Sequence, residues 1–475
     1  MSLSTTPRRP NILFLMADQF RGDIMSCAGG PAKTPNLDVL AAEGIRFTQC
    51  STPAPLCVPA RVALFTGKYA HSTGAWDNSH YILSANANLW SRTLHDLGYA
   101  SAMLGKTHLH GGGGDIIGRE HLVNAYGFDT VDEITGPHAS ASPKIKTHMT
   151  EKWRAKGLWD AFSADIKKRG KTPMAYPSPL PLEDYYDVYV GNKGNEFLEN
   201  YKGDQPWFCH VSFGGPHEPW DTPEPFASMY DPADMPPPRP AMKNADPDRP
   251  RGRTDELMIK EKIHCSPEQA AEIRADYCGA VTLIDEQIGR LFDTIRRRGE
   301  WNNTIILFTS DHGEMNGDQG FVNKRTFLDG ALNIPLLIRT PETAAAGGGM
   351  VSDALVSLVD VGPTLVELAG GSLNYEQCGK SLCPILNGTA ESVHDYVLSE
   401  LSGEIMYMDN EWKVAVNNQG RIHLLFDRRA DPEEQYNLAG STKDIESLVR
   451  DRMLRAIVQN QCIIPAVTQQ FSDNE

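Results

Sequence analysis

One cysteine in the sequence stands in a setting that suits a reactive thiol. Cys57 lies in the segment Cys57-Val58-Pro59-Ala60-Arg61, between two prolines and just ahead of an arginine. The reactivity of a cysteine depends on its exposure and on nearby positive charge, which stabilises the thiolate. A cysteine taken alone is more often an inert buried thiol, but an inert thiol does not require flanking prolines and a nearby arginine. Cys57 is therefore a candidate nucleophile.

Four apolar runs end in side chains that can do acid–base or metal chemistry. The runs cover 11–19, 99–110, 207–219 and 303–314, and each contains a stretch of about the length of a buried strand. The polar residues at their ends are Asp18, Gln19, Lys106, His108, His217, Asp311 and His312. Ligands of parallel sheets bind beyond the carboxyl ends of the strands, so we expect these side chains to share one edge. Each alone also fits a helix cap or an ordinary turn, but four such strand ends are hard to explain by turns.

The elements that must position these side chains alternate between strands and helices. The clearest helix pattern covers 266–299, which opens with Ser-Pro-Glu and repeats apolar residues at helical spacing. A strand pattern follows within a few residues. This alternation predicts an α/β fold with a large mixed, mostly parallel sheet flanked by helices.

The pattern changes after about residue 390. Short strand-like runs separated by turns indicate a small C-terminal antiparallel α+β subdomain, with a closing helix near 443–459. We predict a catalytic domain over 1–390 and this subdomain over 391–475. Segments 111–118, 137–181 and 231–254 are glycine-rich, aperiodic and proline-rich, respectively, and are expected to be loop insertions.

Composition narrows the class of protein and its partners. The chain has 475 residues, 40% hydrophobic and 22% charged, which is typical of a globular protein. Its formal net charge of −16, without a basic tract, argues against nucleic acid and against an anionic membrane as partners. No apolar run approaches the roughly 20 residues of a membrane span. The apolar segment near the N-terminus is too short for a signal peptide, so we predict a cytoplasmic protein.

The segment around Cys57 resembles the sulfatase family, in which C-x-P-x-R is followed by a run such as LFTGKYAHSTG. Further segments resemble the family in the same order: TPNLDVLAAEGIRFTQCST, LGKTHLH, SDHGEMNGDQGFVNK, LVSLVDVGPTLVELAG and LLFDRRADPEEQYNLAG. A lone C-x-P-x-R is a weak signal, but these motifs in order cover most of the chain. The resemblance implies an alkaline phosphatase-like fold and hydrolysis of sulfate monoesters to an alcohol and sulfate.

The resemblance also implies a modified nucleophile. A formylglycine-generating enzyme would convert Cys57 to formylglycine, whose hydrated aldehyde attacks sulfur and later expels sulfate. The run after Pro59 predicts the start of a helix. The nucleophile would then lie at the positive end of a helix, which suits an anionic ester.

A divalent cation belongs to the same resemblance. The ligands it implies are Asp18, Gln19, Asp311, His312 and an oxygen derived from Cys57. Oxygen ligands favour calcium, magnesium or manganese. Gln19 stands where a second acid is usual, and His312 where asparagine is also common. Calcium is expected from the family, and this softer, less charged set leaves Mn²⁺ or Mg²⁺ as alternatives. The same choices resemble phosphonate monoester hydrolases and choline sulfatases.

The remaining cations would act on the charge of the ester. Arg61 would orient and polarise the diol. Lys106 and Lys324 would neutralise the non-bridging oxygens, where negative charge must be held through the transition state. The position of Lys324, thirteen residues after Asp311, matches the family.

Two histidines would move protons and two further residues would bind the anion. His108 would assist the second deprotonation of the diol, and His217 would protonate the leaving alcohol. Motif alignment favours His108 over His110. Thr107 would donate a hydrogen bond, and Asn78, in a Trp-Asp-Asn segment, could reach the bound anion.

Three functions stay open at this point. The first is hydrolysis of a sulfate monoester, with a small anionic ester as substrate. The second is hydrolysis of a phosphonate monoester or phosphodiester by the same residues, because both substrates carry one negative charge at a tetrahedral centre. The third is a non-catalytic protein that binds a sulfated ligand. An apolar stretch at 463–467 also leads us to expect a homo-oligomer.

Overall fold

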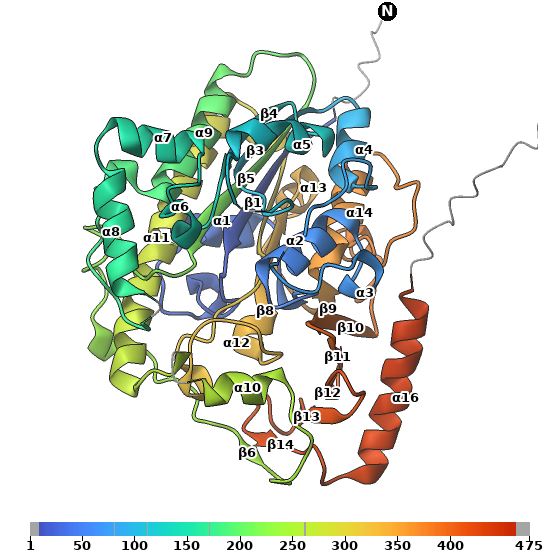
Figure 1. The fold of residues 1–475 in the computed structure, drawn as a ribbon. Coiled ribbons are helices and arrows are strands. Elements are labelled where there is room, and N and C mark those ends of the chain that lie inside the picture. Colours follow the sequence, from blue (N-terminus) through green and yellow to red (C-terminus); the bar gives the residue numbers. More distant parts are fainter. Residues whose placement is uncertain (1–8, 80, 112, 171, 261–262, 462–475) are drawn as a thin grey trace, which may run out of the picture.

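A central sheet of eight strands organises the molecule (Figure 1). The computed structural model describes residues 9–79, 81–111, 113–170, 172–260 and 263–461. In spatial order the strands are β4 (Thr130–Ile134), β3 (Ala100–Lys106), β5 (Trp207–Pro216), β1 (Asn11–Asp18), β7 (Thr304–Ser310), β8 (Asn333–Arg339), β2 (Ile45–Ser51) and β9 (Met350–Ser357). Only β8 runs antiparallel to its neighbours, β7 and β2. The mixed, mostly parallel sheet expected from the sequence is confirmed.

Strand β1 shows why the apolar run at 11–18 is continuous. Leu13 and Leu15 pack in the hydrophobic cluster formed with α9 (Tyr186–Asn200) and α11 (Pro267–Arg297). Ile12 and Phe14 pack in the cluster formed with α2 (Cys57–Thr66), α4 (Trp90–Asp96) and α14 (Val361–Leu368). Alternate side chains of a strand point to opposite faces, and helices cover both faces here (Figure 1). Every position of β1 is therefore buried.

The longest helix begins where its sequence signal predicts. Ser266 is the N-cap of α11, and its side chain accepts a hydrogen bond from the backbone N–H of Gln269. The Gln269 side chain accepts one in return from the backbone of Ser266, and Pro267 occupies the first helical position. The other helices of four residues or more outside 137–181 and before residue 390 are α1 (Pro35–Glu43), α3 (Ala70–Thr73), α5 (Glu120–Ala125), α10 (Arg253–Ile259), α12 (Asp329–Leu332), α13 (Pro341–Ala345) and α15 (Cys383–Leu386).

The C-terminal part forms a second, antiparallel sheet. Its strands are β10 (Tyr396–Leu401), β11 (Glu404–Asp409), β12 (Trp412–Val416) and β13 (Ile422–Asp427), and α16 (Lys443–Gln459) follows. The antiparallel subdomain and its closing helix, predicted near 443–459, are confirmed. Ala63, Tyr69 and Val359 pack in one cluster with side chains of this sheet. The boundary at 390 stays a prediction.

The insertions hold more regular structure than expected. The segment 137–181 contains α6 (Pro137–Ser140), α7 (His148–Ala155) and α8 (Trp159–Arg169). Within 231–254, β6 (Lys243–Asn244) pairs with β14 (Tyr436–Asn437). Among the described residues, no helix is both long enough and apolar enough to cross a bilayer. The apolar stretch at 463–467 lies outside the described residues.

Candidate active site

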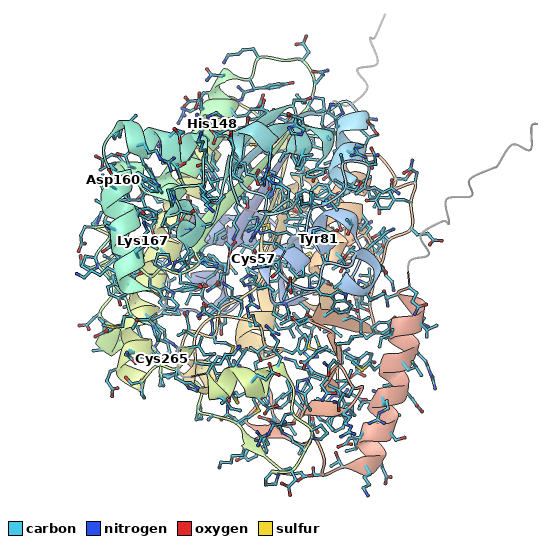
Figure 2. All side chains as sticks on the ribbon, viewed as in Figure 1. Cys57, Tyr81, His148, Asp160, Lys167 and Cys265 are labelled. Carbon is cyan, nitrogen blue, oxygen red and sulfur yellow. The ribbon has the colours of Figure 1, made fainter. Side chains whose placement is uncertain are left out.

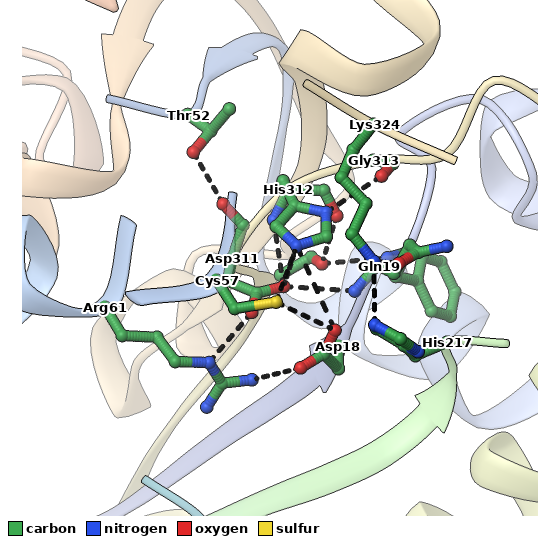
Figure 3. A network of polar contacts seen from close by, with 12 residues as sticks. Asp18, Gln19, Thr52, Cys57, Arg61, His217, Asp311, His312, Gly313 and Lys324 are labelled. Carbon is green, nitrogen blue, oxygen red and sulfur yellow. Dashed lines mark hydrogen bonds and ion pairs between the residues drawn. The ribbon is translucent and has the colours of Figure 1, made fainter. Parts of the chain in front are cut away.

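The strand ends singled out in the sequence meet at one edge of the sheet. Asp18 ends β1 and Lys106 ends β3, whereas His217 and Asp311 follow β5 and β7 directly. Strands β3, β5, β1 and β7 are consecutive neighbours. Their carboxyl ends therefore bring residues far apart in the chain together, as Figure 3 shows for Asp18, His217 and Asp311.

Cys57 lies at the start of a helix inside this group of residues. It is the first residue of α2, so the helix begins at Cys57 and not after Pro59, where the sequence analysis placed its start. Its Sγ lies 3.2 Å from His312 Nε2 and 3.9 Å from Asp18 Oδ1 (Figure 3). Asn78 Oδ1 accepts a hydrogen bond of 2.9 Å from the backbone N–H of Val58, which holds the first turn of α2 in place.

The surroundings of Cys57 favour an anion. Burial by itself would raise the pKa of the thiol, but the positive charges of Lys106 and His312 outweigh burial and hold that pKa well below its ordinary value. Burial likewise opposes the charge on His312, yet Asp311 and Cys57 raise the pKa of His312 to about 9. A negatively charged reacting group is therefore stabilised at this position.

Cys57 and three neighbouring side chains form a cluster that is suited to binding a divalent cation. The ligand atoms of Asp18, Cys57, Asp311 and His312 all lie within 4.8 Å of one another and are buried. His312 Nδ1 donates to the backbone oxygen of Gly313 at 3.0 Å, which leaves Nε2 for the cluster. Two carboxylates and an imidazole at these positions fit the donor set of a hard or borderline cation.

Gln19, the fourth expected protein ligand, makes other contacts with its side chain. Its Nε2 donates to Glu314 and, at 2.8 Å, to Glu218 Oε2, and its Oε1 accepts from Lys324. Its backbone N–H donates to Asp311 Oδ1 at 3.0 Å. Gln19 thus orients one metal-type ligand through its backbone, and the ligand role of its side chain stays a prediction.

Arg61 bridges the two acids of the cluster. Its Nε donates to Asp311 Oδ2 at 2.8 Å and its Nη2 to Asp18 Oδ2 at 3.1 Å. Lys106 Nζ forms a second ion pair with Asp18. Burial works against ionisation of Asp18, but Lys106, His217 and Arg61 together hold its pKa below its ordinary value. Arg61 and Lys106 therefore both stabilise the ionised form of Asp18.

Lys324, His217 and an unpredicted acid form a second group on the opposite side of the cluster. Lys324 Nζ donates to His217 Nε2 at 2.7 Å and lies 3.4 Å from Glu218 Oε2. His217 Nδ1 donates to the backbone oxygen of Glu218 at 2.6 Å. Despite burial, His217 and Lys324 lower the pKa of Glu218 to about 2. Glu218 directly follows His217, and that adjacency was the only sequence signal for it.

Two adjoining cavities open beside these residues. The smaller, about 160 Å³, is lined by Cys57, Lys106 and His108. The larger, about 350 Å³, is lined by Lys324 and by residues of the insertions. Asn78, His138 and His217 line both, so the sites predicted for anion binding and for proton transfer border the same space.

The two residues that follow Lys106 differ in their contacts. His108 lines the smaller cavity, and burial and the charge of Lys106 lower its pKa. Thr107, in contrast, donates its hydroxyl to Glu133 and lines neither cavity among the described residues. A substrate-binding role of Thr107 therefore stays a prediction that its present contact does not favour.

Comparison with known proteins decides the family. The chain matches the family model described as Sulfatase over residues 10–372, which is most of its length. The chain belongs to the sulfatase family. A second model, described as N-sulphoglucosamine sulphohydrolase, C-terminal, matches residues 317–461 of this sulfatase.

Individual relatives agree with this placement. The N-acetylglucosamine-6-O-sulfatase of Bacteroides thetaiotaomicron is 26% identical over 92% of this chain and 84% of its own length. The choline-sulfatase of Rhizobium meliloti is 28% identical over 95% of this chain and 87% of its own length. The crystal structure of the phosphonate monoester hydrolase of Agrobacterium radiobacter superposes with a TM-score of 0.76 at 25% identity, covering 95% of this chain and 96% of that one. The sulfatase resemblance and the fold predicted from the sequence are confirmed.

Proposed function

We propose that this sulfatase hydrolyses sulfate monoesters to an alcohol and sulfate with a nucleophile derived from Cys57. One observation carries the proposal: Cys57 begins α2 in the cluster of Asp18, Asp311 and His312, and Lys106 lies beside Asp18. Converted to formylglycine by a formylglycine-generating enzyme, Cys57 would supply a hydroxyl group that attacks sulfur. The residues around it then bind and orient the ester.

The cations of the site would act on the negative charge of the ester. Lys106 pairs with Asp18, and Lys324 pairs with Glu218. Both are nearly buried, so their charges are weakly screened by solvent. They are therefore suited to stabilising the non-bridging oxygens in the transition state.

The proton for the leaving alcohol would come through His217. Its Nε2 accepts a hydrogen bond from the Lys324 ammonium, and its Nδ1–H is held by the backbone oxygen of Glu218. His217 can thus take a proton at Nε2 and pass it to the leaving oxygen. His108 lines the cavity that contains Cys57 and would take the second proton from the nucleophile.

A divalent cation would be held by Asp18, Asp311, His312 and the Cys57-derived group, where it would neutralise charge at the nucleophile. Calcium follows from the family. The imidazole of His312 makes manganese an alternative, and the carboxylate oxygens of Asp18 and Asp311 leave magnesium as another. Elemental analysis of the purified protein tests this. We expect about one divalent ion per chain, and loss of that ion in Asp311→Asn.

A second candidate function is hydrolysis of phosphonate monoesters or phosphodiesters. The similarity to the phosphonate monoester hydrolase structure supports it. The test is kcat/KM for an aryl sulfate and an aryl phosphonate monoester, measured on one preparation shown by mass spectrometry to carry formylglycine at position 57. A preference for sulfate of a hundredfold or more supports the first function, and the reverse preference would replace it by the second.

The setting in the cell and the assembly state remain part of the proposal. A cytoplasmic location and a small anionic ester as substrate rest on the sequence alone. The proposed homo-oligomer also rests on the sequence alone. Sedimentation that shows only a monomer at micromolar concentration would remove the oligomer.

A further inference from the structure

His110 lies beside the catalytic residues, but the chemistry assigned above does not use it. It lines the cavity of about 160 Å³ together with Cys57, Lys106 and His108, and it is 2% exposed. The sequence analysis set it aside in favour of His108 on motif alignment. The structure instead places both histidines in the wall of the same cavity.

A buried acid holds the ring of His110. His110 Nε2 lies 2.7 Å from Glu133 Oε2, and the other carboxylate oxygen accepts the hydroxyl of Thr107. Glu133 is in β4, paired in parallel with Gly105 of β3, so the sheet itself sets its position. An ionised carboxylate only accepts hydrogen bonds. Nε2 of His110 therefore carries the hydrogen, and the orientation of the ring is fixed.

The second ring nitrogen of His110, Nδ1, differs from Nε2 in its contacts. His110 Nδ1 is buried and has no hydrogen-bond partner among the residues that the structure describes. Buried polar atoms are almost always hydrogen-bonded, so a partner from outside the chain, such as a ligand group or a water molecule, would complete the hydrogen bonds of this ring. Apolar side chains of Ile116, Ile134 and Ala139 also line this cavity. The hydroxyl of Thr135, which also lines it, is already paired with Ser140 at 2.9 Å.

The chemistry of Nδ1 selects the group that would fill this place. A hydroxyl can donate to a ring nitrogen that lacks hydrogen and can accept from one that carries it. A plain aryl ring or a quaternary ammonium can do neither. The cavity is small and also contains Cys57, so the group must lie within a few bonds of the ester.

We propose that His110, positioned by Glu133, binds a hydroxyl group on the carbon next to the one that carries the sulfate ester. The substrates would then be sulfate esters of polyols or sugars, preferred over esters without a second hydroxyl. This inference rests on the proposed sulfate ester hydrolysis.

Two chromogenic aryl sulfates provide the test. The probes are 4-nitrophenyl sulfate and 2-hydroxy-5-nitrophenyl sulfate, of which the second carries a hydroxyl beside the ester. The readout is the ratio of their kcat/KM values, compared between wild type and variants so that the intrinsic reactivities of the probes cancel. All proteins must carry formylglycine at position 57 and show comparable thermal unfolding.

A matched pair of variants separates the two ring nitrogens. In His110→Gln the amide reaches toward Glu133 and leaves the Nδ1 position empty. We expect kcat/KM for 2-hydroxy-5-nitrophenyl sulfate, divided by kcat/KM for 4-nitrophenyl sulfate, to fall tenfold or more relative to wild type. In His110→Asn the amide replaces Nδ1, and we expect most of the ratio to return. Glu133→Gln, which loosens the ring, should give an intermediate ratio.

The alternative outcomes each have a separate meaning. Equal losses on both probes in His110→Gln would assign His110 a structural or general catalytic role and overturn the inference, as would an unchanged ratio. If the modified wild-type protein hydrolysed neither probe, the proposed function itself would fail and the inference with it.

Discussion

Buried carboxyl groups behave in opposite ways in two regions of this sulfatase. At the catalytic edge of the sheet, neighbouring cations overcome the effect of burial and keep the pKa of Asp18 and Glu218 below ordinary values, to about 2 for Glu218. In the helical layer, burial prevails and raises the pKa of Asp187 in α9 and of Asp276 in α11 to about 7. Asp18, Asp187 and Asp276 are all buried, whereas the Glu218 side chain is 21% exposed. Among the three buried acids, the difference in pKa follows from the charges beside them.

This difference in charge separates a region that takes part in catalysis from a region that supports the fold. At the edge, the cations beside Asp18 and Glu218 keep these two acids ionised, and their charge is available to a metal and to the groups that bind an anionic ester. In the helical layer, Asp187 accepts hydrogen bonds of 2.8 and 3.0 Å from the backbone of Gly214 and Gly215, which lead to His217. Its other oxygen has no partner among the described residues, as suits a carboxyl that keeps a proton. Substitutions at the carboxyl edge of the sheet should therefore affect mainly catalysis, and substitutions in the helical layer should affect mainly the stability of the fold.

The largest expected effect is that of Cys57→Ala. Removing the nucleophile should lower kcat/KM for an aryl sulfate by more than about a thousandfold. Thermal unfolding of the variant checks that the fold is kept. Cys209→Ala, a buried cysteine in β5, is the control and should lower stability while keeping activity. Unchanged cleavage by Cys57→Ala would exclude this nucleophile.

Arg61→Met should damage both catalysis and stability. It leaves Asp18 and Asp311 buried without their shared guanidinium, and breaking a buried pair in this way costs roughly 3–5 kcal/mol of unfolding free energy. Activity should fall at least about a hundredfold. Urea unfolding and kcat/KM measure the two effects. Unchanged stability would show that the acids do not need the arginine.

Lys324→Ala should act mainly on catalysis. We expect kcat/KM to fall by about 10²–10³, because a buried cation that faces the ester is lost together with the hydrogen bond to His217. Lys167→Ala, which removes an exposed lysine of α8 far from Cys57 (Figure 2), is the matched control. Equal activity of the two variants would remove Lys324 from the site.

The smallest effect concerns pH and the helical layer. In the unfolded chain Asp187 loses its proton near pH 4, but in the folded protein only near pH 7. Between these values the folded state holds a proton that the unfolded state has released, so unfolding free energy falls as pH rises, by up to about 1.4 kcal/mol per pH unit for one group.

Asp187→Asn should therefore make the pH dependence of stability less steep between pH 4 and pH 7, and Asp276 and Asp285, whose pKa values are also raised, should contribute to the slope that remains. Urea unfolding across this range measures the slope. Asp234→Asn, at an exposed position, serves as the control and should keep the wild-type slope. A slope that stays the same in Asp187→Asn would mean that this carboxyl is ionised in the folded protein.

Much of the site could be predicted because its signals are local. Each buried strand is a continuous apolar run, and the polar residue that ends it is visible without knowledge of its neighbours. Cys57 and Arg61 belong to one short motif. The approach of Glu133 to His110 and Thr107 could not be predicted, because it depends on the register between β3 and β4. Gln19 was expected to point at a metal, but three residues distant in sequence engage its amide.

The sequence by itself determined the α/β fold, the resemblance to sulfatases and the residue types at the carboxyl edge, because periodicity and motifs are properties of neighbouring residues. Only the tertiary structure decided which side chains pair. Asp18 is charged because Lys106 and Arg61 reach it from other elements, whereas Asp187, which has no cation beside it among the described residues, keeps its proton. Electrostatic energies depend on distances between residues far apart in the chain, and those distances exist only in the folded protein.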